Sequence, residues 1–130
     1  MKRRSVTVPG LEHGSNPVPA ASRLGPLLAT GGVRGVDTAT GQLPPAAEDQ
    51  VRLAFVNLRT IIEEGGGRAE DIVHVTVFAA AEGLRPVLNE EWVAMFPDVA
   101  SRPARHLLRQ DLPGGMLVQL EAMAYITEGE

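Results

Sequence analysis

The chain has 130 residues, of which 44% are hydrophobic and 22% charged, as is typical of one globular domain spanning residues 1–130. Its formal net charge of −4 and its scarcity of aromatic residues (one Trp, one Tyr and three Phe) argue against binding to nucleic acid. The absence of cysteine excludes disulfides and thiol chemistry, and no apolar run approaches the ~20 residues needed to cross a bilayer. No long apolar stretch follows the basic start at residues 1–4, so we expect a cytoplasmic protein that does not associate with membranes.

The first 45 residues are rich in glycine and proline, a composition typical of short strands joined by turns. Within them, residues 27–30 are predicted as a strand that ends at Gly31 and Gly32. The glycines of residues 31–35 lack the Gly-Lys-Ser/Thr sequence of a phosphate-binding loop, which favours turns as their role.

A strong helix is predicted after the proline-rich segment. Apolar side chains from Val51 to Ile62 recur at intervals of three and four residues and form one broad stripe. Glu48 and Asp49 fall in the first turn, where negative charge suits the helix dipole. The three glycines at 65–67 are expected to end the helix.

Residues 71–80 alternate in a way that predicts a strand with two different faces. Val73, Val75 and Val77 fall on one face. The other face carries Ile72, His74, Thr76 and Phe78. Residues 83–96 are then predicted as a second amphipathic helix, which a proline stops.

Two further strands are predicted over residues 104–110 and 116–126. One face of the last strand suits a helix layer: Val118, Leu120, Ala122 and Ala124. The opposite face is mixed but substantially apolar: Leu117, Gln119, Glu121 and Met123.

The order of these elements predicts an α+β fold in which two helices cover one face of a sheet. No third helix remains to cover the second face. A contiguous apolar patch of several hundred Å² is unusual on a monomer. We therefore expect other copies of the chain to bury the second face, in an assembly with closed cyclic symmetry.

Seven segments, in order and spacing, resemble the RidA/YjgF family of reactive-intermediate deaminases. They are residues 27–32, 37–41, 57–61, 71–78, 101–105, 112–115 and 117–124. The resemblance covers nearly the whole chain from about Asn16 onward. It implies a chorismate-mutase-like fold and a homotrimer whose sheets line a central barrel, with clefts for a small carboxylate-bearing metabolite between subunits. The implied reaction is hydrolysis of an enamine or imine to a keto acid and ammonia, without a metal or organic cofactor.

Arg105 is the residue that the resemblance assigns to the substrate carboxylate. A planar, permanently charged guanidinium can bind a carboxylate through two hydrogen bonds, although the same residue type also forms surface or interface salt bridges. The resemblance adds the backbone at Gly31 to this site. The remaining candidate ligand-binding residues are Thr30, Asn89, Val18 and Phe78.

Gln119 departs from the family pattern, in which a glutamate is thought to position the attacking water. Glutamine can hold a water molecule but cannot take a proton at neutral pH. Glu121 is the nearest carboxylate by sequence on the same strand face, and its alternative role is a structural acid paired across the trimer barrel. Val18 falls where many members carry a tyrosine over the cleft. A subgroup resembling 2-aminomuconate deaminases fits these departures.

His13, His74 and His106 show no metal-ligand spacing, so no metal site is expected. His74 is interpreted as a hydrogen-bonded interface residue. Strand alternation places His106 on the face opposite Arg105. Besides a deaminase, Gln119 leaves open a non-catalytic trimer that binds or senses small carboxylates. The acidic net charge argues against a third hypothesis, an endoribonuclease.

Overall fold

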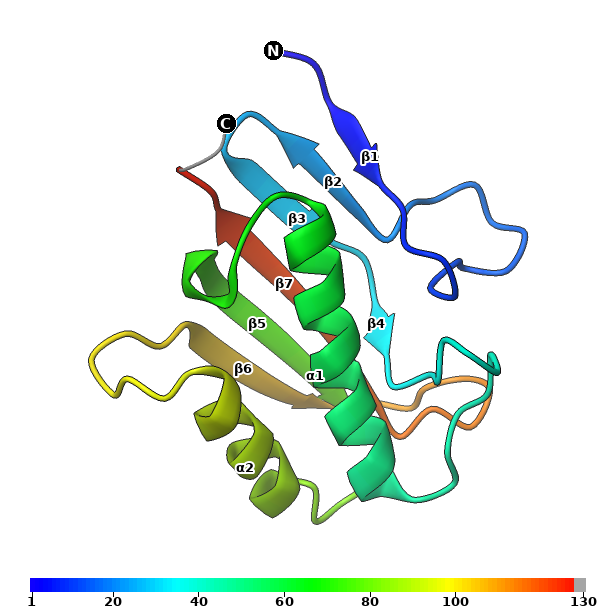
Figure 1. Cartoon of the computed structure of the whole chain (residues 1–130). Helices are drawn as coiled ribbons and strands as arrows, with labels where there is room; N and C mark the ends of the chain where they lie inside the picture. Colours follow the sequence, from blue (N-terminus) through cyan, green and yellow to red (C-terminus); the bar gives the residue numbers. More distant parts are fainter. Residues whose placement is uncertain (128–130) are drawn as a thin grey trace.

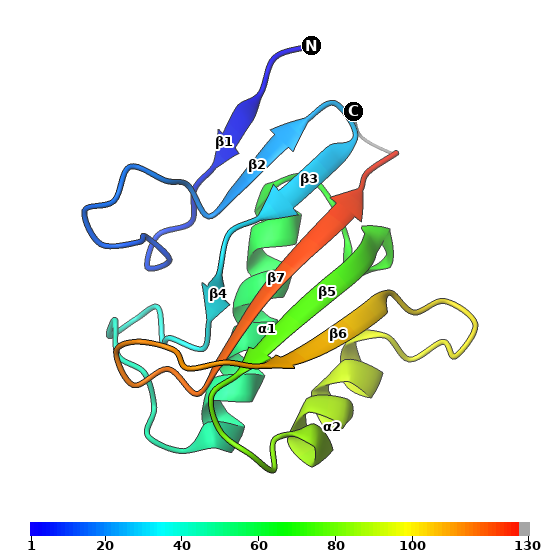
Figure 2. The same ribbon diagram turned by 180° about the vertical axis from the view of Figure 1, so that it is seen from behind.

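The computed structural model describes residues 1–127 as a mixed β-sheet with two helices on one face (Figures 1 and 2). The strands are β1 (Arg4–Val6), β2 (Ala21–Leu24), β3 (Leu27–Thr30), β4 (Val33–Arg34), β5 (Ile72–Ala79), β6 (Ala104–Arg109) and β7 (Val118–Tyr125). The helices are α1 (Ala47–Glu64) and α2 (Arg85–Met95), with a short 3₁₀ turn η1 (Ala69–Asp71) before β5. No helix within residues 1–127 is long and apolar enough to cross a membrane.

The strands are ordered β1-β2-β3-β7-β5-β6, and β4 pairs with the N-terminal half of β7 (Figure 2). All neighbouring strands are antiparallel except β5 and β6, which are parallel. Such a pair needs a crossover connection, which α2 supplies. The two helices and the mixed sheet match the predicted α+β class.

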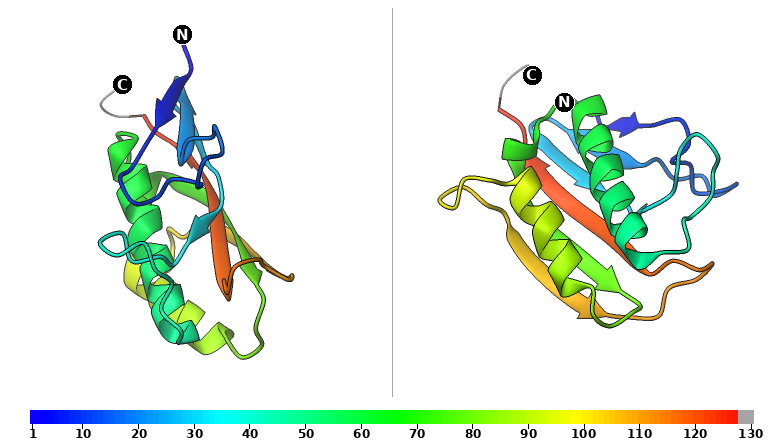
Figure 3. Two further views of the ribbon diagram at one scale, coloured as in Figure 1. Left: turned by 90° about the vertical axis from the view of Figure 1, so that its right-hand side faces the viewer. Right: turned by 60° about the horizontal axis from the view of Figure 1, so that its bottom comes forward.

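The core lies between the sheet and the helices, as the edge-on view in Figure 3 shows. Leu58 and Ile62 of α1 are fully buried against the sheet, as the predicted stripe requires. Trp92 of α2 packs edge-on against Phe55 and Phe96, with ring centroids 6.4 and 4.7 Å apart. Aromatic contacts therefore join the two helices as one layer.

The predicted faces of the last strand are confirmed, but the start of β5 is different from the prediction. Ile72 is buried, whereas Val73 is 54% exposed, so these two residues exchange the faces assigned to them. The cause is a shift in the register with β7 between Ile72 and His74. Such a bulge adds one residue to a strand and reverses the alternation before it. From Val75 onward the alternation is as predicted.

Candidate functional site

Arg105 lies on the edge strand β6 and points to the helix side of the sheet, because it pairs with the buried Val75 of β5. Its Nη2 donates a hydrogen bond to Asn89 Oδ1 of α2, with an N–O distance of 2.8 Å. Its guanidinium carbon lies 5.0 Å from the ring centroid of Trp92. Asn89 and Trp92 are three residues apart on one helix face, so α2 orients this cation at two points.

The guanidinium of Arg105 has hydrogen-bonding capacity that the chain leaves unused. Within residues 1–127, its Nη1 atom is buried and has no hydrogen-bond partner. Burial lowers the pKa of Arg105, and the positive charge of Arg85 lowers it further. An arginine nevertheless remains charged in a protein. An anion that reached this guanidinium would supply the missing hydrogen-bond acceptor and reduce the repulsion between the two cations.

A second group of predicted residues surrounds two consecutive glycines between β3 and β4. A methyl group placed on Gly31 would lie 3.7 Å from His13 Nε2, and one on Gly32 would lie 2.5 Å from Gln119 Nε2. The Gly31 N–H already donates to the carbonyl of Ala20, at 2.9 Å. The side-chain position of Gly31 therefore faces an imidazole, and that of Gly32 faces an amide.

The uncovered face of the sheet holds the remaining candidates. Thr30 and Glu121 line a hollow of about 350 Å³ on this face, together with His74, Thr76 and Met123. The Thr30 hydroxyl is fixed, because it accepts a hydrogen bond from the Ala122 N–H and donates one to the Gly31 carbonyl. Phe78 pairs with Gln119 across β5 and β7, and Val18 is 54% exposed in the loop before β2.

The residues around Arg105 and the residues around Gly31 do not meet within one chain. Thr30, Ala122, Val75 and Arg105 form one row across β3, β7, β5 and β6. Three strand spacings separate the ends of this row by about 14 Å. Arg105 also points to the helix side, whereas Gln119 lies on the uncovered face. A site containing both Arg105 and Gly31 would therefore need residues from two copies of the chain.

Comparison with known proteins identifies the family. The family model described as endoribonuclease L-PSP matches residues 15–126. The chain belongs to this family, which is also called RidA/YjgF. A RutC family protein of Aquifex aeolicus is 30% identical over 122 residues, which cover 93% of this chain and 98% of that protein. The 2-iminobutanoate/2-iminopropanoate deaminase of Escherichia coli is 31% identical over 103 residues, covering 78% and 80%. The crystal structure of E. coli TdcF with bound serine superposes with a TM-score of 0.86 at 25% identity and covers 95% of this chain and 99% of that one.

The family resemblance and the sequence patterns both missed the support that α1 gives to the Gln119 region. The buried Gln50 donates to the carbonyls of Pro44 and Gly115 and accepts a hydrogen bond from the Leu117 N–H. The buried Asn57 donates to the carbonyls of Arg34 and Val36, both at 2.9 Å. The sequence did contain a signal for these buried amides, because both fall within the apolar stripe of α1, seven residues apart.

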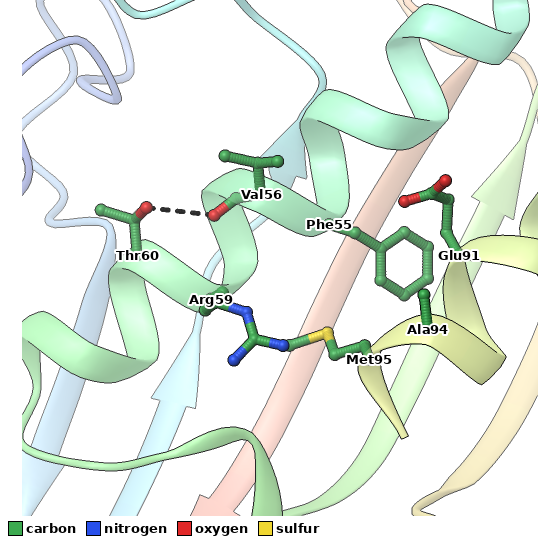
Figure 4. A pocket seen from close by; sticks show the side chains of 7 residues that line it. All are labelled: Phe55, Val56, Arg59, Thr60, Glu91, Ala94 and Met95. Carbon is green, nitrogen blue, oxygen red and sulfur yellow. Dashed lines mark hydrogen bonds between the residues drawn. The ribbon is translucent and has the colours of Figure 1, made fainter. Parts of the chain in front are cut away.

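A hollow between the two helices offers no comparable chemistry (Figure 4). It is lined by Phe55, Val56, Arg59, Thr60, Glu91, Ala94 and Met95. The Thr60 hydroxyl donates a hydrogen bond to the Val56 carbonyl of its own helix, at 3.0 Å, and Arg59 extends toward Met95 (Figure 4). None of the site residues predicted from the sequence lies there. In the part of the chain that the structure describes, no three His, Asp or Glu side chains are grouped to hold a metal ion.

Proposed function

We propose that the chain is a cytoplasmic deaminase that hydrolyses small enamine or imine carboxylates to a keto acid and ammonia. The main observation in support is the guanidinium of Arg105. Asn89 and Trp92 orient it, and one of its N–H groups is buried without a partner within residues 1–127. Two relatives support the substrate class, since one is named an iminobutanoate deaminase and the other was crystallised with serine. Both names point to small molecules with one carboxylate beside a carbon–nitrogen bond.

The active site is proposed to lie between subunits of a homotrimer whose sheets line a central barrel. Two observations support this assembly. Three strand spacings, about 14 Å, separate Arg105 from Thr30, the neighbour of Gly31, in one chain. The mixed sheet face that carries Met123 and Tyr125 has no cover within residues 1–127. In a closed ring, the β6 edge of one subunit can meet the Gly31 region of the next.

In this cleft, the substrate carboxylate binds Arg105 and Asn89 stays beside it as the orienting group. The reacting carbon then lies toward Gly31, where the missing Cβ leaves room. Gln119 holds the attacking water through its amide, and Glu121 lies two residues farther along the same strand face. Phe78 and Val18 bound the cleft with apolar surface, and Thr30 fixes the backbone next to Gly31.

Gln119 also favours a second candidate, a trimer that binds small carboxylates without turning them over. A glutamine cannot act as the base that a glutamate would supply, and loss of a positioned base typically costs ~10²–10⁴-fold in rate. The endoribonuclease in the family description receives no such support, because the net charge of −4 does not favour a polyanion.

The test is release of ammonia and keto acid from 2-iminobutanoate generated in situ, with a dicarboxylic enamine of the 2-aminomuconate kind as a second substrate. Arg105→Ala is expected to lower kcat/KM by about 10- to 150-fold, since hydrogen bonds to a charged group contribute about 1.5–3 kcal/mol. Arg109→Ala is the matched control, because Arg109 lies on the same side of β6 but forms a surface ion pair with Glu82 at 3.1 Å. Binding of a keto acid without any acceleration of ammonia release would instead establish the non-catalytic trimer.

A further inference from the structure

Hydrolysis of an enamine moves protons at two points, and Glu121 is the one acid–base side chain proposed so far for the site. A proton must reach the enamine carbon, and another must leave the attacking water. Gln119 can hold that water but can do neither. Arg105 remains charged throughout and cannot serve as a base. If the proposed function holds, the residues considered so far therefore offer one acid–base group for two proton transfers.

The imidazole of His13 lies where such a group is needed. Its Nε2 atom is 3.7 Å from the position that a Cβ of Gly31 would occupy. The imidazole therefore lies beside the Cα of Gly31, where no side chain separates it from a substrate held against this residue. Gln119 Nε2 lies closer still to the next residue, Gly32, at 2.5 Å from its Cβ position. The imidazole and the water-holding amide therefore flank adjacent residues.

The loop that carries His13 is anchored to the same corner of the sheet. Arg34 Nη2 donates to the carbonyl of Glu12 at 3.0 Å, and Arg34 pairs with Gln119 across β4 and β7. The Glu12 carboxylate in turn accepts a hydrogen bond from the Gly10 N–H at 3.1 Å. One strand residue thus links the loop of His13 to the strand position of Gln119. The charged groups on the loop, β4 and β7 are Glu12, Arg34 and Glu121.

We infer that His13 is the proton-transfer residue of the deamination. Imidazolium gives its proton to the enamine carbon, and the nitrogen lone pair forms the C=N bond of the iminium. The water oxygen then bonds to the iminium carbon, the C=N electron pair returns to nitrogen, and the water proton goes to His13. Finally the nitrogen takes this proton and leaves as ammonia with the C–N electron pair. The hydroxyl gives its proton to His13, which returns to imidazolium, as the C=O bond of the keto group forms. Enamine and water are consumed, and keto acid and ammonia are formed.

The experiment measures ammonia release from 2-iminobutanoate by the full chain and by His13→Gln, His13→Ala and His106→Gln. His106 is the matched control because it lies on the face of β6 opposite Arg105, where it pairs with Thr76, and the mechanism gives it no role. His13→Gln and His13→Ala are expected to lower kcat by about 10²-fold with little change in KM. Added imidazole should restore part of the activity of His13→Ala, and the pH profile of kcat should differ between the full chain and His13→Gln.

The outcomes separate this inference from the proposed function. If the full chain does not accelerate ammonia release, the proposed function is wrong and His13 has no reaction to serve. If the full chain is active and both His13 variants stay within twofold of it, His13 transfers no proton. A large loss in His13→Ala that imidazole leaves unchanged, with an unaltered pH profile, would show a structural role only and would also overturn the inference.

Discussion

The two faces of β7 have very different surroundings although they alternate along one strand. On the helix side, Val118, Leu120 and Ala124 are at most 1% exposed. On the other side, Met123 and Tyr125 are 45% and 54% exposed. The helix side therefore completes its packing within one chain, whereas the uncovered side presents large apolar groups that a folded monomer leaves in water. This difference separates residues that stabilise the fold from residues proposed to stabilise the assembly.

The largest effect is expected from a charge on the uncovered face. Met123→Asp should abolish the proposed trimer, because each uncompensated buried carboxylate costs about 3–5 kcal/mol and three copies would meet in the barrel. Sedimentation velocity should show a trimer for the full chain and a monomer with intact helical circular dichroism for the variant. Val93→Asp is the matched control, since Val93 is 49% exposed but lies on α2. A full chain that sediments as a monomer would refute the assembly.

Shortening a side chain should affect stability differently on the two faces of β7. Leu120→Ala is expected to lower the free energy of unfolding by about 2–5 kcal/mol, because Leu120 is fully buried in the core. This loss should not depend on protein concentration. Met123→Ala should destabilise the protein by an amount that does depend on concentration, because it weakens association. Urea denaturation at two protein concentrations measures both, and equal concentration dependence would contradict the separation of the two faces.

The sequence was sufficient to predict the helix layer, because the apolar periodicity of residues 51–62 and the alternation of Val118 to Ala124 depend only on local geometry. It could not predict the bulge at Ile72, because an inserted residue leaves the hydrophobic composition of a strand unchanged. The candidate site was predicted in part. Arg105 and Asn89 were named and do meet.

His13 was not predicted as a site residue, because the sequence offers only its metal-ligand spacing to judge it by, whereas His74 and His106 can also be placed on strand faces. The proximity of His13 to Gly31 depends on how the loop before β2 folds back, which a gap of 18 positions in sequence does not reveal. Gln50 and Asn57 were overlooked for another reason. Polar residues within an apolar stripe are often tolerated at its border, and only the structure shows that each one binds two backbone carbonyls.

A buried polar contact on the helix side should cost less than a core truncation. Asn57→Ala leaves the carbonyls of Arg34 and Val36 without their donor, which is expected to cost about 1–3 kcal/mol in unfolding free energy. Thr60→Ala on the same helix should change stability by less than about 0.5 kcal/mol, because its hydroxyl is exposed and bonds only within α1. Urea denaturation compares the two. Equal losses would indicate that Asn57 contributes through helix propensity alone.

The smallest effect on stability, and the most specific effect on activity, is expected at the glycine pair beside the uncovered face. Neither glycine has a positive φ, so alanine can adopt both backbone conformations. At Gly31 the nearest atoms to a new methyl lie at 3.7–3.9 Å, an ordinary contact, so Gly31→Ala should fold normally and raise KM by filling the space next to His13. At Gly32 the methyl would meet the Gln119 amide at 2.5 Å and displace it, so Gly32→Ala should lower kcat instead. Steady-state kinetics on 2-iminobutanoate would contradict this assignment if both variants changed the same parameter.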